Sequence, residues 1–344
     1  MKHVLVARLD NDGDVLLAGP AIRAVAAGAD RVTLLCGPRG RQAAELLPGV
    51  STIRAFRAPW IDPEPEPVDR AEMLTLVDEL AAMAIDEAIV LTSFHQSALP
   101  LALLLRMARV PRIAAVSEDY PGSLLDVRHQ VRDDLHEVER ALSTVATLGY
   151  ELAPDDGGEL RVDTRGATRP DDLATPYVVV HPGASVPARA WEPERNARLV
   201  QALAGAGRRV VVTGSPGERD LTASVAGPPR DEVVDLGGTT DLPGLAEVLR
   251  AADAVVVGNT GPSHLAAAVG TPVVSLFAPT VPPVRWRPWL VRHELLYTNV
   301  PCAGCRAREC PVPGHPCIGR VDVGDVVAAI DRLTQPVPVL REVA

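Results

Sequence analysis

Long apolar segments, lysine and aromatic side chains are the scarcest features of this 344-residue sequence. No apolar run reaches the roughly 18 residues that a membrane-spanning helix needs, and the first residues lack the features of a signal peptide. Lysine occurs once, as Lys2, and acidic residues outnumber basic ones by 44 to 34, for a formal net charge of -10. Such a surface is unsuited to general binding of nucleic acid or anionic lipid. We therefore expect a cytoplasmic protein with no nucleic-acid partner and at most peripheral membrane contact.

Glycine signatures of nucleotide binding are also missing from the N-terminal region. After the apolar segment 3–7 the chain reads Arg-Leu-Asp-Asn-Asp-Gly-Asp, without the three spaced glycines of a dinucleotide-binding turn, and no Gly-Lys-Ser/Thr string follows. This pattern argues against a dinucleotide-dependent oxidoreductase and a P-loop enzyme. The turn carries carboxylates instead, and Asp14 stands where a strand passes into a helix. Asp14 is a candidate general base, and the alternative is that Asp12 or Asp14 caps the helix predicted over 15–27.

Short apolar segments typical of strands alternate with amphipathic segments typical of helices, and this alternation occurs twice along the chain. In the first half we predict strands over 3–7, 31–36, 88–91 and 112–116, and helices over 15–27, 39–47, 69–84, 97–108 and 131–148. In the second half we predict strands over 177–180, 209–213, 233–236, 254–257 and 273–276, and helices over 193–206, 218–226, 242–251, 263–269 and 323–333. The polar segment 154–176 between them is typical of a linker. The pattern predicts an α/β protein with two parallel-sheet domains, over 1–165 and 166–334, and a tail over 335–344.

The most distinctive segment is the small-residue turn at 258–262 between the predicted strand 254–257 and the predicted helix 263–269. Gly258 and Gly261 let the backbone approach a ligand closely, and Pro262 suits the first turn of a helix. The free N–H groups and the positive dipole end of that helix favour a diphosphate. The alternative is a plain strand-to-helix turn that needs glycines.

Four segments occur in a fixed order along the chain: 8–17, the turn 181–185 with Arg189-Ala190-Trp191, the turn 213–218, and 258–262. Together they resemble glycosyltransferase family 9, the heptosyltransferase family, and they span nearly the whole chain. The resemblance implies a GT-B fold, in which two Rossmann-like domains face a central cleft. It implies that the N-terminal domain binds the acceptor and the C-terminal domain binds the nucleotide-sugar donor. It further implies heptose transfer from ADP-heptose to a lipopolysaccharide acceptor, with inversion and without a required metal or cofactor.

Site residues follow from the same resemblance. Asp14 matches the catalytic aspartate, Arg189 the basic residue that meets the donor phosphates, and Glu218 the acid near the nucleotide. The other expected donor-binding residues flank these motifs: Gly13, His181, Ser185, Asn259, Thr260, Gly261 and His264. Asn259 departs from the pattern, because many relatives have aspartate there and an amide supplies no negative charge. For Ser185 and the two histidines the alternative is a role within their own turns, and we expect Trp191 to line a core or the cleft.

The cysteines raise a separate question. Cys36 lies in a predicted buried strand, whereas four others gather near the C-terminus: Cys302, Cys305, Cys310 and Cys317. The Cys302-x-x-Cys305 spacing is typical of zinc ligands, but the spacing of the other two matches no common zinc module. We expect the four cysteines to be reduced thiols that shape a loop and to bind no metal. The alternative is a zinc ion held by these four cysteines.

These observations predict an inverting, metal-independent glycosyltransferase. Its donor is expected to be ADP-heptose or a related nucleotide sugar, and its acceptor a hydroxyl of a glycan, as in lipopolysaccharide core biosynthesis, or of a small molecule. We expect it to act as a monomer. One alternative is a catalytically silent module that binds sugar nucleotides, and another is a nucleotide-sugar epimerase of the same two-domain design.

Overall fold

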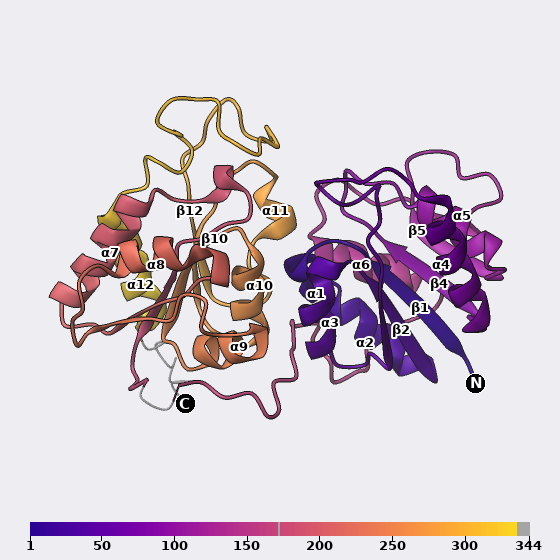
Figure 1. Ribbon diagram of the computed structural model, residues 1–344, viewed down its shortest axis with the longest axis horizontal. Coiled ribbons are helices and arrows are strands. Elements are labelled where there is room, and N and C mark those ends of the chain that lie inside the picture. The colour runs from indigo at the N-terminus through magenta and orange to yellow at the C-terminus, as the bar shows by residue number, and fades with distance from the viewer. Residues whose placement is uncertain (171–172, 336–344) are drawn as a thin grey trace, which may run out of the picture. The chain divides into compact units, whose positions relative to one another are not determined.

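The computed structural model describes residues 1–170 and 173–335. Of the tail predicted over 335–344, all but the first residue lies outside the described residues. The chain divides into two compact units. Unit 1 comprises Met1–Arg165 and Val284–Trp289, and unit 2 comprises Gly166–Pro283 and the chain from Leu290 onward. Each unit contains its own sheet (Figure 1). Each also has its own apolar core. None of the helices in the described ranges is long and apolar enough to cross a bilayer.

Unit 1 is built on a parallel sheet that contains six strands within the described residues, in the order β3-β2-β1-β4-β5-β6. Its strands are β1 (His3–Arg8), β2 (Arg31–Cys36), β3 (Thr52–Ala55), β4 (Glu87–Leu91), β5 (Arg112–Val116) and β6 (Val127–His129). The strand order reverses direction between β1 and β4, which is the switch point of a Rossmann-like sheet. Ligands of such sheets bind beyond the carboxyl ends of the strands at this point.

Helices cover both faces of the first sheet. Helices α4 (Arg70–Ala82) and α5 (Leu99–Met107) pack on one face, and α1 (Asp12–Leu17), α2 (Gly19–Gly28), α3 (Arg41–Leu46) and α6 (Glu137–Ala146) lie on the other (Figure 1). The continuous apolar run of β1 is buried because both faces of the strand are covered. The charged residues that follow the strand therefore lie at the edge of a rigid core.

Unit 2 repeats this design. Its parallel sheet, again of six strands within the described ranges, has the order β12-β11-β10-β7-β8-β9. The strands are β7 (Val178–His181), β8 (Val210–Val212), β9 (Val233–Asp235), β10 (Ala254–Gly258), β11 (Val273–Leu276) and β12 (His293–Leu296). The helices are α7 (Pro193–Gly205), α8 (Arg219–Ala226), α9 (Leu242–Arg250), α10 (Gly261–Ala268) and α12 (Val323–Thr334). The switch point here lies between β7 and β10.

The predicted α/β architecture of two Rossmann-like domains is confirmed, with local corrections. The helix predicted over 15–27 is two helices, because the chain breaks at Ala18 and Pro20 opens the second. The helix predicted over 131–148 begins only at Glu137, where His136 forms a capping box with Glu139. The prediction missed the segment Val284–Trp289, which includes most of the short helix α11 (Pro283–Trp286) and belongs to unit 1.

Candidate functional site

The first polar cluster lies at the switch point of unit 1, and Arg8 is its centre. Arg8 ends β1 and is 3% exposed. Its guanidinium contacts Asp10 Oδ2 at 2.9 Å, donates to Asp14 Oδ1 at 2.9 Å, and lies 3.5 Å from Glu137 Oε2. It also donates to the hydroxyl of Ser93, just beyond β4, at 2.8 Å. The side chain of Asp14 is 19% exposed, so one carboxylate of the cluster is held by Arg8 and still reaches solvent.

The charges of this cluster are unbalanced, because one guanidinium contacts three carboxylates. Burial lowers the pKa of Arg8, but the charges of Asp10, Asp14 and Glu137 outweigh burial and raise it above its ordinary value. Burial raises the pKa of Asp10 to about 6 against the opposing charge of Arg8. Burial also raises the pKa of Glu137. Asp10 and Glu137 therefore take up protons at a higher pH than exposed carboxyls do.

The capping alternative for this turn is wrong. Helix α1 starts at Asp12, and its N-cap is Asn11, whose side chain makes no capping hydrogen bond. The carboxylate of Asp12 instead accepts a hydrogen bond from the backbone N–H of Ala43 at 3.0 Å, which ties α1 to α3. Asp14 is the third residue of the helix and contacts Arg8. Asp12 thus has a structural role, and Asp14 does not cap the helix.

The second polar cluster lies at the carboxyl ends of the unit 2 strands, where the turns after β7 and β8 meet. His181 ends β7, and its Nδ1 hydrogen-bonds to Thr213 Oγ1 at 3.0 Å. Glu218 accepts hydrogen bonds from the backbone N–H and the hydroxyl of Ser215, at 2.7 and 2.8 Å. A Cβ added to Gly183 would lie 2.0 Å from Glu218 Oε1, so only glycine lets this carboxylate lie against the turn. Burial lowers the pKa of His181, and the charge of Glu218 opposes that shift.

The turn after β10 joins the same cluster. A Cβ on Gly258 would lie 2.8 Å from the backbone oxygen of Arg189, so the short helix η2 (Pro187–Arg189) passes directly over this glycine. Asn259 is buried, and its Oδ1 accepts a hydrogen bond from the backbone N–H of Ala278 at 3.2 Å. The amide of Asn259 therefore links the ends of β10 and β11. An aspartate could accept the same hydrogen bond, so the departure at Asn259 leaves this contact intact.

Helix α10 starts at the centre of the cluster. Thr260 is its N-cap in extended conformation, and its side chain makes no capping hydrogen bond. The hydroxyls of Thr260 and Ser263 are buried, and neither has a hydrogen-bond partner among the described residues. Buried hydroxyls normally find partners. Two such hydroxyls beside the positive end of a helix suit an oxyanion ligand such as phosphate.

The structure brings together most of the predicted donor-binding residues. Seven of them lie at or just beyond the carboxyl ends of β7, β8 and β10: His181, Arg189, Glu218, Asn259, Thr260, Gly261 and His264. Ser185 follows β7 but is exposed, and Gly13 lies in α1 of unit 1, whereas the other predicted donor-binding residues belong to unit 2. Trp191 is part of the unit 2 core, as expected. Sequence reasoning missed Arg8, Ser93 and Glu137, and the only signal for Arg8 was an arginine ending a fully apolar strand.

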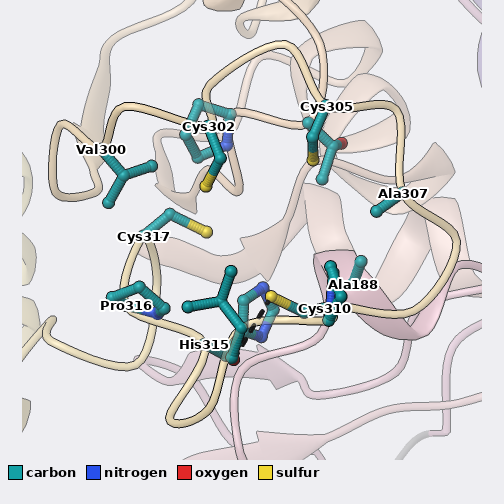
Figure 2. A pocket seen from close by; sticks show the side chains of 13 residues that line it. Ala188, Val300, Cys302, Cys305, Ala307, Cys310, His315, Pro316 and Cys317 are labelled. Carbon is teal, nitrogen blue, oxygen red and sulfur yellow. Dashed lines mark hydrogen bonds between the residues drawn. The ribbon is translucent and has the colours of Figure 1, made fainter.

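All five cysteines are free thiols. Cys36 is buried in β2, where burial raises the pKa of its thiol to about 11. The other four line one pocket of unit 2, together with His315 and apolar side chains (Figure 2). Burial raises the pKa of the Cys317 thiol, and the other three cysteines of this pocket add to the shift. As the side chains stand in the described ranges, no three His, Cys, Asp or Glu residues already form a metal-binding set.

Two Rossmann-like domains, each with polar residues gathered at the switch point of its sheet, define a two-domain α/β protein of the GT-B type. The chain belongs to glycosyltransferase family 9 (heptosyltransferase), whose family model matches residues 73–315. This finding confirms the family that the sequence motifs indicated.

Individual relatives are more distant. The chain is 29% identical over 166 residues to lipopolysaccharide heptosyltransferase 3 of Escherichia coli, which is 46% of each chain. It is 32% identical over 178 residues to lipopolysaccharide heptosyltransferase 1 of Pseudomonas aeruginosa, which is 51% of this chain and 48% of that protein. These matches span about half the length of the curated relatives. The E. coli heptosyltransferase WaaC, solved with ADP-2-deoxy-2-fluoro heptose, shares the fold with a TM-score of 0.74 at 22% identity, over 96% of this chain and 99% of that one.

Proposed function

We propose that this protein is an inverting glycosyltransferase that needs no metal ion for the transfer step. It takes a heptose or related sugar from a nucleotide-activated donor such as ADP-heptose and transfers it to a hydroxyl of a glycan or small-molecule acceptor. The proposal assigns donor binding to unit 2 and acceptor activation to unit 1. It describes a cytoplasmic monomer with at most peripheral membrane contact.

The buried hydroxyls of Thr260 and Ser263 at the start of α10 carry the proposal. A departing diphosphate develops negative charge, which hydrogen-bond donors and a helix N-terminus stabilise without reorganisation. Arg189, on the turn that crosses Gly258, would add a formal positive charge beside them. This set of groups serves the leaving group, which is why the chemistry requires no metal at that position.

Asp14 supports the other half of the reaction. Transfer with inversion requires a base that takes the proton from the acceptor hydroxyl as the hydroxyl attacks the anomeric carbon. Asp14 has one oxygen held by Arg8 and remains partly exposed, so its carboxylate is oriented and reachable.

The test compares Asp14→Asn with the wild-type protein. We expect acceptor-dependent release of ADP from ADP-heptose to fall by about 100-fold or more, because the amide cannot take up the proton, while the Kd for ADP stays within about threefold. Asp12→Asn is the matched control, because its amide oxygen can still accept the hydrogen bond of Ala43. Nuclear magnetic resonance of the product gives the anomeric configuration, and turnover with EDTA present tests the metal requirement.

The same assay separates the alternatives. A silent binding module would bind ADP-heptose without any turnover in the wild-type protein. An epimerase would convert the sugar nucleotide when no acceptor is present. Near-normal transfer by Asp14→Asn would remove this aspartate from the reaction.

A further inference from the structure

The loop between β12 and α12 carries all four clustered cysteines. Residues 297–322 contain no helix or strand. Loops of this length without secondary structure are uncommon in compact domains, and those that are ordered usually have a function or an additional constraint. Backbone hydrogen bonds attach this one to the rest of unit 2: Gly304 N to Pro279 O at 2.7 Å, Arg306 N to Thr280 O at 2.9 Å and Ala188 N to Arg308 O at 3.0 Å. Within the loop, Thr298 N donates to Cys317 O at 2.7 Å.

These attachments fold the loop around one pocket. Cys302, Cys305, Cys310 and Cys317 all line it, and their sulfurs turn toward its interior (Figure 2). Cys302 and Cys305 sit on a tight turn with Gly304 at φ 78°, a conformation that glycine adopts without strain. Cys310 and Cys317 come from the returning part of the loop, and Cys317 is 7% exposed. Two separate stretches of chain therefore present thiols to the same space.

We propose that Cys302, Cys305, Cys310 and Cys317 hold one thiophilic metal ion, zinc or iron(II), in a tetrahedral site. Four thiolates are a complete ligand set for a structural ion of this kind, and the Cys-x-x-Cys pair supplies two ligands from one turn. The thiols lose their protons to solvent when the ion binds, and no electron transfer is involved. This inference reverses our expectation of no metal site, because the fold brings the four cysteines to one pocket despite their irregular spacing.

The present side-chain positions define what binding has to change. As whole residues, Cys302 and Cys305 are exposed, Cys310 is half-buried and Cys317 is buried. Coordination therefore draws the two exposed thiols inward toward Cys317. The ion would link distant parts of the loop. The wall of the pocket also includes Ala188 and Thr280, and Ala188 directly precedes Arg189. The site is structural, and it braces the turn that carries Arg189.

The first test is metal content. Untagged protein from medium that contains both zinc and iron is purified without chelator, and elemental analysis determines metal per chain. We expect about one equivalent in the wild-type protein and in Cys36→Ala, whose thiol lies in β2 of unit 1, and less than about a tenth in Cys302→Ser/Cys305→Ser. The element found distinguishes zinc from iron.

The second test does not depend on the folding of a variant. Wild-type protein is stripped with chelator under anaerobic conditions, alkylated with iodoacetamide with or without added Zn²⁺, and digested for mass spectrometry. We expect Zn²⁺ to slow alkylation of Cys302 and Cys305 by about tenfold or more, and added Co²⁺ to produce sulfur-to-cobalt absorption bands. Metal content below about a tenth of an equivalent, with unchanged alkylation and no cobalt bands, would overturn the proposal. That outcome would leave the proposed transfer reaction untouched, because Asp14 and the α10 turn are tested separately.

Discussion

At the scale of single residues, Arg8 shows how a buried cation determines the state of a site. It is surrounded by Asp10, Asp14 and Glu137, and two of these carboxyls have raised pKa values because burial disfavours their charge. The planar guanidinium fork reaches several oxygens at once in a fixed geometry, whereas an ammonium is a compact point charge on a flexible stem. Arg8 therefore offsets part of the negative charge of the cluster and fixes the direction of the Asp14 carboxylate.

Replacing Arg8 with methionine should be strongly destabilising. The substitution leaves buried carboxylates facing one another, and we expect the free energy of unfolding at pH 7 to fall by about 3–5 kcal/mol. The loss should shrink near pH 5, because Asp10 and Glu137 then take up protons and the repulsion falls. Denaturant titration at both pH values measures this. Arg8→Lys is the control and should recover part of the stability, and a loss that is equal at both pH values would contradict the account.

The ion pair of Asp156 makes the free energy of unfolding depend on pH in the direction opposite to the buried carboxyls near Arg8. Its carboxylate accepts two hydrogen bonds from Arg23, at 2.6 and 2.9 Å, and these lower the pKa of Asp156 to about 2, although burial opposes the shift. Because the folded-state pKa lies below the unfolded value of about 3.9, the ion pair stabilises fully above that value and is lost as pH falls toward 2.

We therefore expect Asp156→Asn to lower the free energy of unfolding at pH 7 by about 1–2 kcal/mol, with the gap to wild type narrowing by about half at pH 3. Denaturant titrations across this range measure the gap. The exposed neighbour Asp155 is the control, and Asp155→Asn should change stability by less than about 0.5 kcal/mol. A gap that stays constant from pH 7 to pH 3 would show that the pair contributes through packing alone.

At the scale of elements, turns converge because particular glycines allow close approach. The Cβ of an alanine at 258 would lie 2.8 Å from the backbone oxygen of Arg189, and backbone cannot move aside as cheaply as a side-chain tip. Gly258→Ala should therefore displace η2, weaken ADP binding by about tenfold and cost about 1–3 kcal/mol of stability. Calorimetric titration with ADP and thermal unfolding measure the two effects.

Gly205→Ala is the matched control for that substitution. Gly205 ends α7, a Cβ added to it would meet no described atom within 4 Å, and its φ is not in the left-handed region. Alanine has the higher helix propensity, so this variant should keep its ADP affinity and its stability. If Gly258→Ala binds ADP as tightly as Gly205→Ala does, the η2 turn is not part of the donor site.

The elements also show what the sequence can and cannot reveal. Strands such as β1 and β10 were predictable because both faces are buried and nearly every residue is apolar or small. The missed strands β3, β6 and β12 have three or four residues each, most of them half-buried, so they carry no apolar run and are too short for an alternation to stand out.

The candidate site likewise contains residues that could be named from the sequence and contacts that could not. Asp14 and Glu218 stand in local motifs that resemble the family, so their positions could be named from sequence. The contacts of Arg8 with Ser93 and Glu137 join segments far apart in the chain, and no local pattern reports such contacts. The same holds for the cysteine pocket, where the fold brings together thiols whose spacing fits no common module.

At the scale of the whole molecule, the two units are separately cored domains with separate sites. The apolar cluster around β1 and β4 contains residues of unit 1 alone, and the cluster around β7 and β10 contains residues of unit 2 alone. A ligand that binds only the folded state of one unit stabilises that unit by mass action. Local opening free energies can differ between such units, and hydrogen exchange resolves them.

ADP should therefore protect amides in unit 2 and leave unit 1 unchanged. With ADP at about 100 times its Kd, we expect exchange to slow in the segments after β7, β8 and β10, because in the proposed donor site their backbone N–H groups would surround the diphosphate. Exchange in the segment that contains Arg8 and α1 should stay within about twofold of the free protein. Hydrogen-exchange mass spectrometry measures both, and Arg189→Met should lose most of the protection. Protection of α1 without protection of α10 would mean that the nucleotide binds unit 1, and the donor assignment would then be reversed.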